Sequence, residues 1–142
     1  MEKVKWRVLG TADIARGQTI PGMMLAEHCE RYAIAGRRIE KAKSYQEEFG
    51  FRKAYGSYDE LLADPEVQAV YIPLPNDIHC QWTVKALKAG KHVLCEKPLA
   101  LSETQAKEMF TAAEENGVLL MEAFAYLHSP FVQAVKAEID AG

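Results

Sequence analysis

Glu96, Lys97 and Pro98 follow one another directly after the short apolar run at residues 93–95. That run contains a β-branched residue, and Gly90 ends a helical pattern before it, so we interpret it as a buried strand. Ligands of an open parallel sheet bind beyond the carboxyl ends of its strands. Because Pro98 restricts the preceding residue to extended conformations, the sequence predicts that Lys97 is displayed at a ligand-binding edge. A solvated charged turn is the alternative.

A lysine in this place suits hydride transfer. When a hydride leaves an alcohol carbon, the hydroxyl loses its proton and the growing oxyanion needs a fixed cation. A positioned lysine can polarise that oxygen or relay the proton. Lys97 is therefore the predicted catalytic residue.

A second candidate site stands where a predicted first strand, residues 4–10, passes into a helix. The residues of this turn are Gly10, Thr11, Ala12, Asp13, Ile14 and Ala15. A glycine permits the tight turn, small residues let the backbone approach a pyrophosphate, and the helix N-terminus offers N–H groups to the phosphates. Alanine replaces the second and third glycines of the dinucleotide motif, so a purely structural strand–helix turn stays open.

A third candidate is the pair Arg37 and Arg38, which follows a predicted second strand at residues 32–36. Dinucleotide-binding domains often carry a ribose-binding carboxylate at this point. Two guanidinium groups suit a 2′-phosphate instead, so the sequence predicts NADP in preference to NAD. A solvated helix start is the alternative, although basic residues near a helix N-terminus oppose its dipole.

Composition excludes several classes of function. The 142 residues are 49% hydrophobic and 26% charged with a net charge of −3, as expected of one ordinary domain that binds neither nucleic acid nor an anionic membrane. The three cysteines lack metal-ligand spacing, so we predict reduced thiols and no metal site. There is no apolar signal segment and no run of 18 apolar residues. We therefore expect a cytoplasmic protein.

Strand and helix patterns alternate along the chain. Predicted strands lie at 4–10, 32–36, 53–55, 69–72, 93–95 and 118–124. Predicted helices begin near 12 (with a split at Pro21), 39, 58, 76, 102 and 129, with Asn76 or Asp77 as the fourth N-cap and Ser102 with Gln105 as a capping box. This alternation predicts an α/β fold, a Rossmann-type doubly wound parallel sheet.

The last predicted helix has an apolar face formed by Phe131, Val135 and Ile139, and the sequence ends just after it. We expect residues 1–125 to form the NAD(P)-binding domain. Residues 126–142 would begin the connection to a second, α+β substrate domain that is absent from this chain.

Four segments in order resemble the Gfo/Idh/MocA oxidoreductases, the relatives of glucose–fructose oxidoreductase and inositol dehydrogenase. These segments are residues 10–15, 72–79, 96–100 and 121–124. The resemblance implies a cofactor site made of Gly10, Thr11, Ala12, Asp13, Ile14, Arg37, Arg38, Pro73, Pro75, Asn76, His79, Glu96 and Lys97. It also implies that acid–base partners of Lys97 lie in the second domain, and that the protein forms homo-oligomers through that domain.

The resulting function is an NAD(P)-dependent oxidoreductase that transfers hydride between nicotinamide and a small sugar, polyol or dihydrodiol. Without the second domain, we expect these residues alone to be inactive. A non-catalytic dinucleotide-binding or redox-sensing module is the rival hypothesis. Lys97 favours the enzyme, because a sensor needs no cation beside the nicotinamide.

Overall fold

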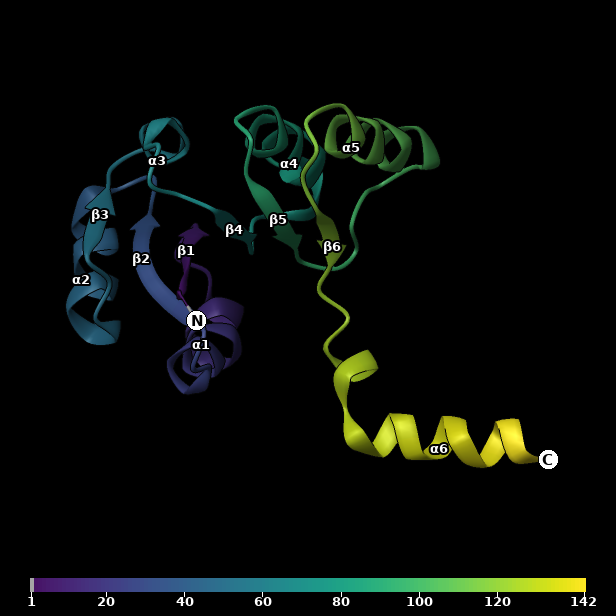
Figure 1. Cartoon of the computed structure of the whole chain (residues 1–142). Helices are drawn as coiled ribbons and strands as arrows, with labels where there is room; N and C mark the ends of the chain where they lie inside the picture. Colours follow the sequence, from purple (N-terminus) through teal and green to yellow (C-terminus); the bar gives the residue numbers. More distant parts are fainter. Residues whose placement is uncertain (1) are drawn as a thin grey trace.

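Six parallel strands form one sheet in the computed structural model, which describes residues 2–142. In chain order they are β1 (Val4–Leu9), β2 (Cys29–Ala35), β3 (Lys53–Tyr55), β4 (Ala69–Ile72), β5 (His92–Cys95) and β6 (Leu120–Glu122). Their order across the sheet is β3-β2-β1-β4-β5-β6 (Figure 1). Since β1 pairs with both β2 and β4, the sheet reverses its direction of growth between them. This is the topological switch point of a doubly wound sheet, so the predicted fold class is confirmed.

Helices cover both faces of this sheet (Figure 1). One face carries α3 (Tyr58–Ala63), α4 (His79–Lys88) and α5 (Glu103–Glu115), and the other carries α1 (Ile20–Leu25) and α2 (Ile39–Phe49). Neighbouring strand residues point to opposite faces, so Leu9 packs in the first of these cores and Val8 in the second. Burial on both faces explains why β4 is a continuous apolar run.

The helix that follows β1 is not split at Pro21, as the sequence had suggested. It passes through a π-helical turn, Ala15–Thr19, in which the Ile20 N–H donates to the Ala15 carbonyl. Pro21 has no N–H, and its ring would clash with a carbonyl in a regular α-helix. The wider turn accommodates the proline, and the helix continues into α1.

Two strand predictions had the wrong length. β2 begins at Cys29 rather than at residue 32, because it pairs with β1 from Val4 onward. β6 covers only Leu120–Glu122 of the predicted 118–124. Hydrogen bonding to the neighbouring strand decides where β2 and β6 begin and end. The hydrophobic pattern within each segment carries no information about that pairing.

The predicted cap at Ser102 is confirmed, since its hydroxyl accepts from the Gln105 N–H at 3.2 Å. The predicted cap of α4 is wrong. Asn76 and Asp77 form a 3₁₀ turn (Asn76–Ile78), and the α-helix begins after it at His79 without a side-chain cap.

The last helix, α6 (Pro130–Ala141), extends away from the sheet (Figure 1). It packs on the 3₁₀ turn Ala125–His128, and the apolar side chains of Phe131, Val135 and Ile139 are exposed. The predicted domain boundary near residue 125 stays a prediction. None of the helices in the described part of the chain is long and apolar enough to cross a membrane.

A buried charge cluster lies around Asp64, in the loop after α3. The Asp64 carboxylate binds the guanidinium of Arg7 at 2.9 Å, the ammonium of Lys53 at 3.0 Å and the hydroxyl of Tyr55 at 2.6 Å. Burial alone raises the pKa of the Asp64 carboxyl, but these hydrogen bonds outweigh it and hold the pKa well below its usual value. The Arg7 side chain is completely buried, so Asp64 neutralises a cation that cannot reach water.

Replacing Asp64 tests the importance of this cluster. We expect Asp64→Asn to lower the free energy of unfolding by about 3–5 kcal/mol, because it leaves the buried Arg7 without its carboxylate. The same change at Asp59, whose ion pair with Lys85 is exposed, should cost at most about 1 kcal/mol. Urea denaturation of both variants measures the difference, and equal costs would contradict the account.

The same carboxylate predicts acid sensitivity. Because its pKa is lower in the folded than in the unfolded chain, its stabilisation is present above about pH 4 and is lost as the pH falls further. Wild type should therefore lose stability below about pH 4 more steeply than Asp64→Asn. Denaturation curves from pH 3 to pH 7 measure this, and parallel curves would contradict it.

Candidate functional site

A cavity of about 400 Å³ lies at the carboxyl ends of β1, β2 and β4, at the switch point of the sheet. The turn after β1, the start of α2 and the loop after β4 all contribute to it. Its lining residues are Gly10, Thr11, Ala12, Arg37, Arg38, Lys41, Tyr58, Pro73, Leu74, Pro75 and Ile78. Seven of the thirteen residues predicted from the sequence to bind cofactor are therefore brought together.

The turn after β1 brings the backbone itself into the wall of the cavity. Gly10 has a φ of +122°, and a Cβ atom there would lie 2.9 Å from Cδ2 of Leu74. Its N–H donates to the carbonyl of Ala35, and the Tyr45 hydroxyl donates to the carbonyl of Thr11. Only glycine fits this position, so the turn leaves its backbone open to a ligand.

Three cations line the cavity on the side of α2. Arg37 and Arg38 are exposed, and neither forms an ion pair with any of residues 2–142, including the nearby Glu40. Lys41 is the third cation, and the sequence analysis missed it. Its place one helical turn after Arg38 was the available signal, since residues three apart share a helix face. The side of the cavity near β2 is therefore suited to an anionic group.

The loop after β4 forms the opposite wall. Pro73 and Leu74 are buried, whereas Pro75 is exposed. Asn76 is exposed but does not line the cavity, and neither do Asp13 and Ile14. Their contacts with a cofactor stay predictions.

His79 corrects a prediction. We had expected it to contact the cofactor, but its ring is completely buried. Its two nitrogens lie 2.8 Å from the carbonyl oxygen of Pro98 and 2.7 Å from that of Leu74. The imidazole therefore connects two loops and does not face the cavity.

The corner at residues 96–99 follows β5, and several side chains hold it. Glu96 accepts a hydrogen bond from the hydroxyl of Tyr71 at 2.8 Å, and Tyr71 in turn accepts from Thr19 at 2.9 Å. Burial, and after it the Glu96 carboxylate, raise the pKa of Tyr71 well above its usual value, so the phenol stays a neutral donor. The second oxygen of Glu96 accepts from the backbone N–H of Lys97 at 3.2 Å.

The far side of this corner is held from β6. Glu122 accepts from the N–H of Leu99 at 2.7 Å, and the peptide bond between Lys97 and Pro98 is cis. The side chain of Lys97 itself is exposed, and its ammonium has no hydrogen-bond partner in the described part of the chain. A cation thus stands free on a corner whose backbone N–H groups are bound by two carboxylates.

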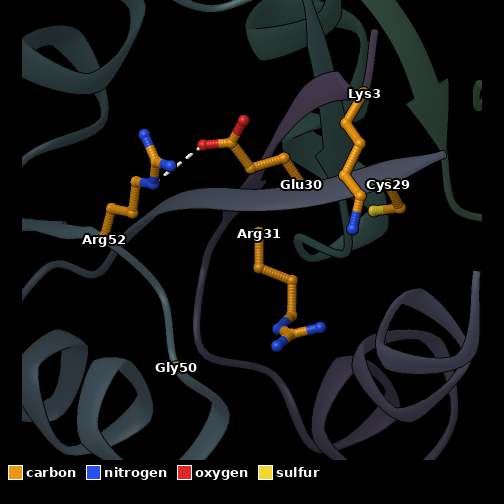
Figure 2. Close-up of a pocket in the computed structure, with 6 residues that line it drawn as sticks. All are labelled: Lys3, Cys29, Glu30, Arg31, Gly50 and Arg52. Carbon is orange, nitrogen blue, oxygen red and sulfur yellow. Dashed lines mark ion pairs between the residues drawn. The ribbon is translucent and has the colours of Figure 1, made fainter. Parts of the chain in front are cut away.

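A second cavity, of about 240 Å³, lies where β2 begins and is lined by Lys3, Cys29, Glu30, Arg31, Gly50 and Arg52 (Figure 2). Arg52 forms an ion pair with Glu30 at 2.9 Å, and Arg31 donates to the carbonyl of Phe49. Burial raises the pKa of the Cys29 thiol, which disfavours the reactive thiolate. This cavity is at the amino end of β2, away from the edge where parallel sheets bind ligands.

The described residues include no group of three histidine, cysteine or acidic side chains that could hold a metal ion. The three cysteines are free, and Cys29 and Cys95 are buried. Burial raises the pKa of Cys95 to about 11. Cys29 and Cys95 therefore serve as small buried side chains, and the reduced state of the three thiols stays a prediction.

Comparison with known proteins agrees with this geometry. The GFO_IDH_MocA family model, described as an oxidoreductase family with an NAD-binding Rossmann fold, matches residues 4–124. D-xylose 1-dehydrogenase (NADP(+)) 2 from Haloferax volcanii is 46% identical over 126 residues, which are 89% of this chain and 38% of that protein. Trans-1,2-dihydrobenzene-1,2-diol dehydrogenase from Xenopus laevis is 35% identical over 137 residues, which are 93% and 40% of the two chains.

A solved structure is similar to this chain in both fold and sequence. The crystal structure of KijD10, a 3-ketoreductase from Actinomadura kijaniata in complex with NADP and TDP-benzene, superposes with a TM-score of 0.95 at 42% identity. The match covers 99% of this chain and 43% of that one. The chain thus spans about two fifths of the length of these relatives.

Gly10 generates a prediction for the turn. We expect Gly10→Ala to lower the free energy of unfolding by about 1–3 kcal/mol, because the new methyl group meets Leu74 at a backbone angle that alanine rarely adopts. Gly17→Ala is the matched control, since a methyl group there meets nothing within 4 Å and should be neutral or stabilising by about 0.5 kcal/mol. Thermal unfolding of both variants measures the effect; equal stability of the two would contradict a close-packed turn.

Proposed function

Because the chain belongs to the Gfo/Idh/MocA family of oxidoreductases, we propose that it binds NADP(H), or less tightly NAD(H), as the cofactor-binding part of an enzyme that oxidises or reduces a sugar-like substrate. The observation that carries the proposal is the cavity at the switch point, where the Gly10 turn faces the cations of α2. Calorimetric titration of the chain with NADP⁺ and NADPH tests it directly. Absence of binding at millimolar concentration would refute it.

The residues present fit such a cofactor. The position of Gly10 has no room for a side chain, so backbone N–H groups of the turn and of the following helix can approach a pyrophosphate. Arg37, Arg38 and Lys41 would hold the adenosine end and its 2′-phosphate. Charge-assisted guanidinium–phosphate bonds are bidentate and strong.

The nicotinamide, when bound, gives or takes the hydride. Lys97 would stabilise the negative charge that develops on the substrate oxygen. Glu96 would orient Lys97 through the hydrogen bond that it accepts from the backbone N–H of Lys97. A free ammonium on a corner held by Glu96 and Glu122 favours catalysis over redox sensing without turnover.

The substrate class is proposed from the names of the relatives. These names indicate a sugar, a nucleotide-linked keto sugar or a dihydrodiol as the substrate of each relative. A small molecule with a hydroxyl or carbonyl group is common to them. The acid–base partners of Lys97 and the surface for homo-oligomer formation would lie in parts of the relatives that this chain does not match. The cytoplasmic location is proposed from the composition of the sequence.

The preference for NADP over NAD is tested by replacing each of the two arginines. We expect wild type to bind NADP⁺ at least about tenfold more tightly than NAD⁺, since one effective guanidinium–phosphate contact contributes roughly 1.5 kcal/mol or more. Arg37→Ala and Arg38→Ala should weaken NADP⁺ and leave NAD⁺ within about threefold. Calorimetry with both cofactors measures this, and Lys43→Ala, which lies on α2 outside the cavity lining, is the control. Equal wild-type affinities would overturn the preference.

Lys97→Ala separates catalysis from binding. In this chain we expect the Kd for NADP⁺ to stay within about threefold, because the ammonium acts mainly on the developing oxyanion. In a longer chain that turns substrate over, kcat should fall about 10²–10³-fold. A sharp rise of Kd with unchanged kcat would make Lys97 a binding residue only.

A further inference from the structure

His79 lies between the loop of Leu74, which lines the cavity, and the corner that displays Lys97. It is the first residue of α4, its ring is completely buried, and each ring nitrogen faces a backbone carbonyl. One carbonyl, of Leu74, belongs to the loop that forms a wall of the cavity. The other, of Pro98, belongs to the corner that displays Lys97.

We propose that His79 is a positioning residue that fixes the corner of Lys97 to the cofactor-side loop, because its buried ring stands within hydrogen-bond distance of one carbonyl of each. A carbonyl oxygen accepts hydrogen bonds and cannot donate them. A ring N–H therefore donates to the carbonyl that it faces, 2.8 Å away for Pro98 or 2.7 Å for Leu74, and the tautomer decides which of the two it is. In either tautomer the buried ring stands between the two loops.

The Leu74 end of the bridge reaches the cofactor turn. The Leu74 side chain packs against Gly10 so closely that no Cβ fits between them. A ligand that orders the Gly10 turn thereby orders Leu74, and the imidazole passes this constraint to Pro98. Lys97 is the residue next to Pro98, so its distance from the cavity depends on the bridge.

The other supports of the corner cannot replace it. Glu96 is held by Tyr71 on β4, and Glu122 holds Leu99 from β6. Both act from within the sheet. In the described part of the chain, His79 provides the side-chain hydrogen bonds between the corner and the loop of Leu74.

His79→Phe tests the proposal, because phenylalanine keeps a ring but removes both ring nitrogens. Leu87→Ala, at a completely buried position on the same helix, is the control for a general loss of stability. Amide hydrogen exchange of Lys97 and Leu99 is the readout without ligand. We expect exchange at these two amides to be about tenfold faster or more in His79→Phe than in Leu87→Ala, compared at equal global stability.

NMR of wild type gives a second readout that does not depend on folding of the variant. The ring N–H of His79 should give a hydrogen-bonded signal that exchanges slowly with water. A ring N–H that exchanges freely, or equal exchange in the two variants, would overturn the proposal.

The effect of the bridge on the position of Lys97 rests on the proposed function. It is measured by NMR titration with NADP⁺ as the probe. In wild type, NADP⁺ should shift the amide signals of Gly10 and Leu99 with one saturation curve. In His79→Phe the Gly10 shift should remain and the Leu99 shift should be lost. If Gly10 does not respond in wild type, the proposed function fails, and the exchange and ring measurements still decide the role of His79.

Discussion

The contact between Gly10 and Leu74 is the constraint on which the site depends. It joins the end of β1 to the loop after β4, the two neighbours across the switch point. Because no side chain fits between them, the backbone of the first turn lies open at the carboxyl edge of the sheet. The cavity and its three cations lie around this turn.

The corner that carries Lys97 is organised by carboxylates and one imidazole. Glu96 and Glu122 bind backbone N–H groups on either side of Lys97–Pro98, and His79 faces the Pro98 carbonyl. These side chains leave the lysine ammonium free while the backbone beneath it is fixed. In the proposed function, a cation placed in this way would need no rearrangement when charge develops on a substrate.

Stability and function use different parts of the sheet. The buried ion pair between Arg7 and Asp64 joins β1 to the loop after α3, and neither residue lines the cavity. Exposed cations stand instead at the cavity, where Arg37 and Arg38 have no internal partner in residues 2–142. An unpaired cation is inexpensive at the surface, whereas a buried one requires its carboxylate.

The alternation of strands and helices, the glycine turn, the cap at Ser102 and the lysine corner could be predicted from the sequence. Each is encoded in a few neighbouring residues, through hydrophobic period, backbone freedom or a local hydrogen bond. Three features arise from long-range packing: His79 is buried between two carbonyls, Lys41 joins the arginines, and Asp64 binds an arginine 57 positions earlier in the chain. The partners in these contacts are chosen by strand order and by helix packing across the sheet, which no local pattern contains.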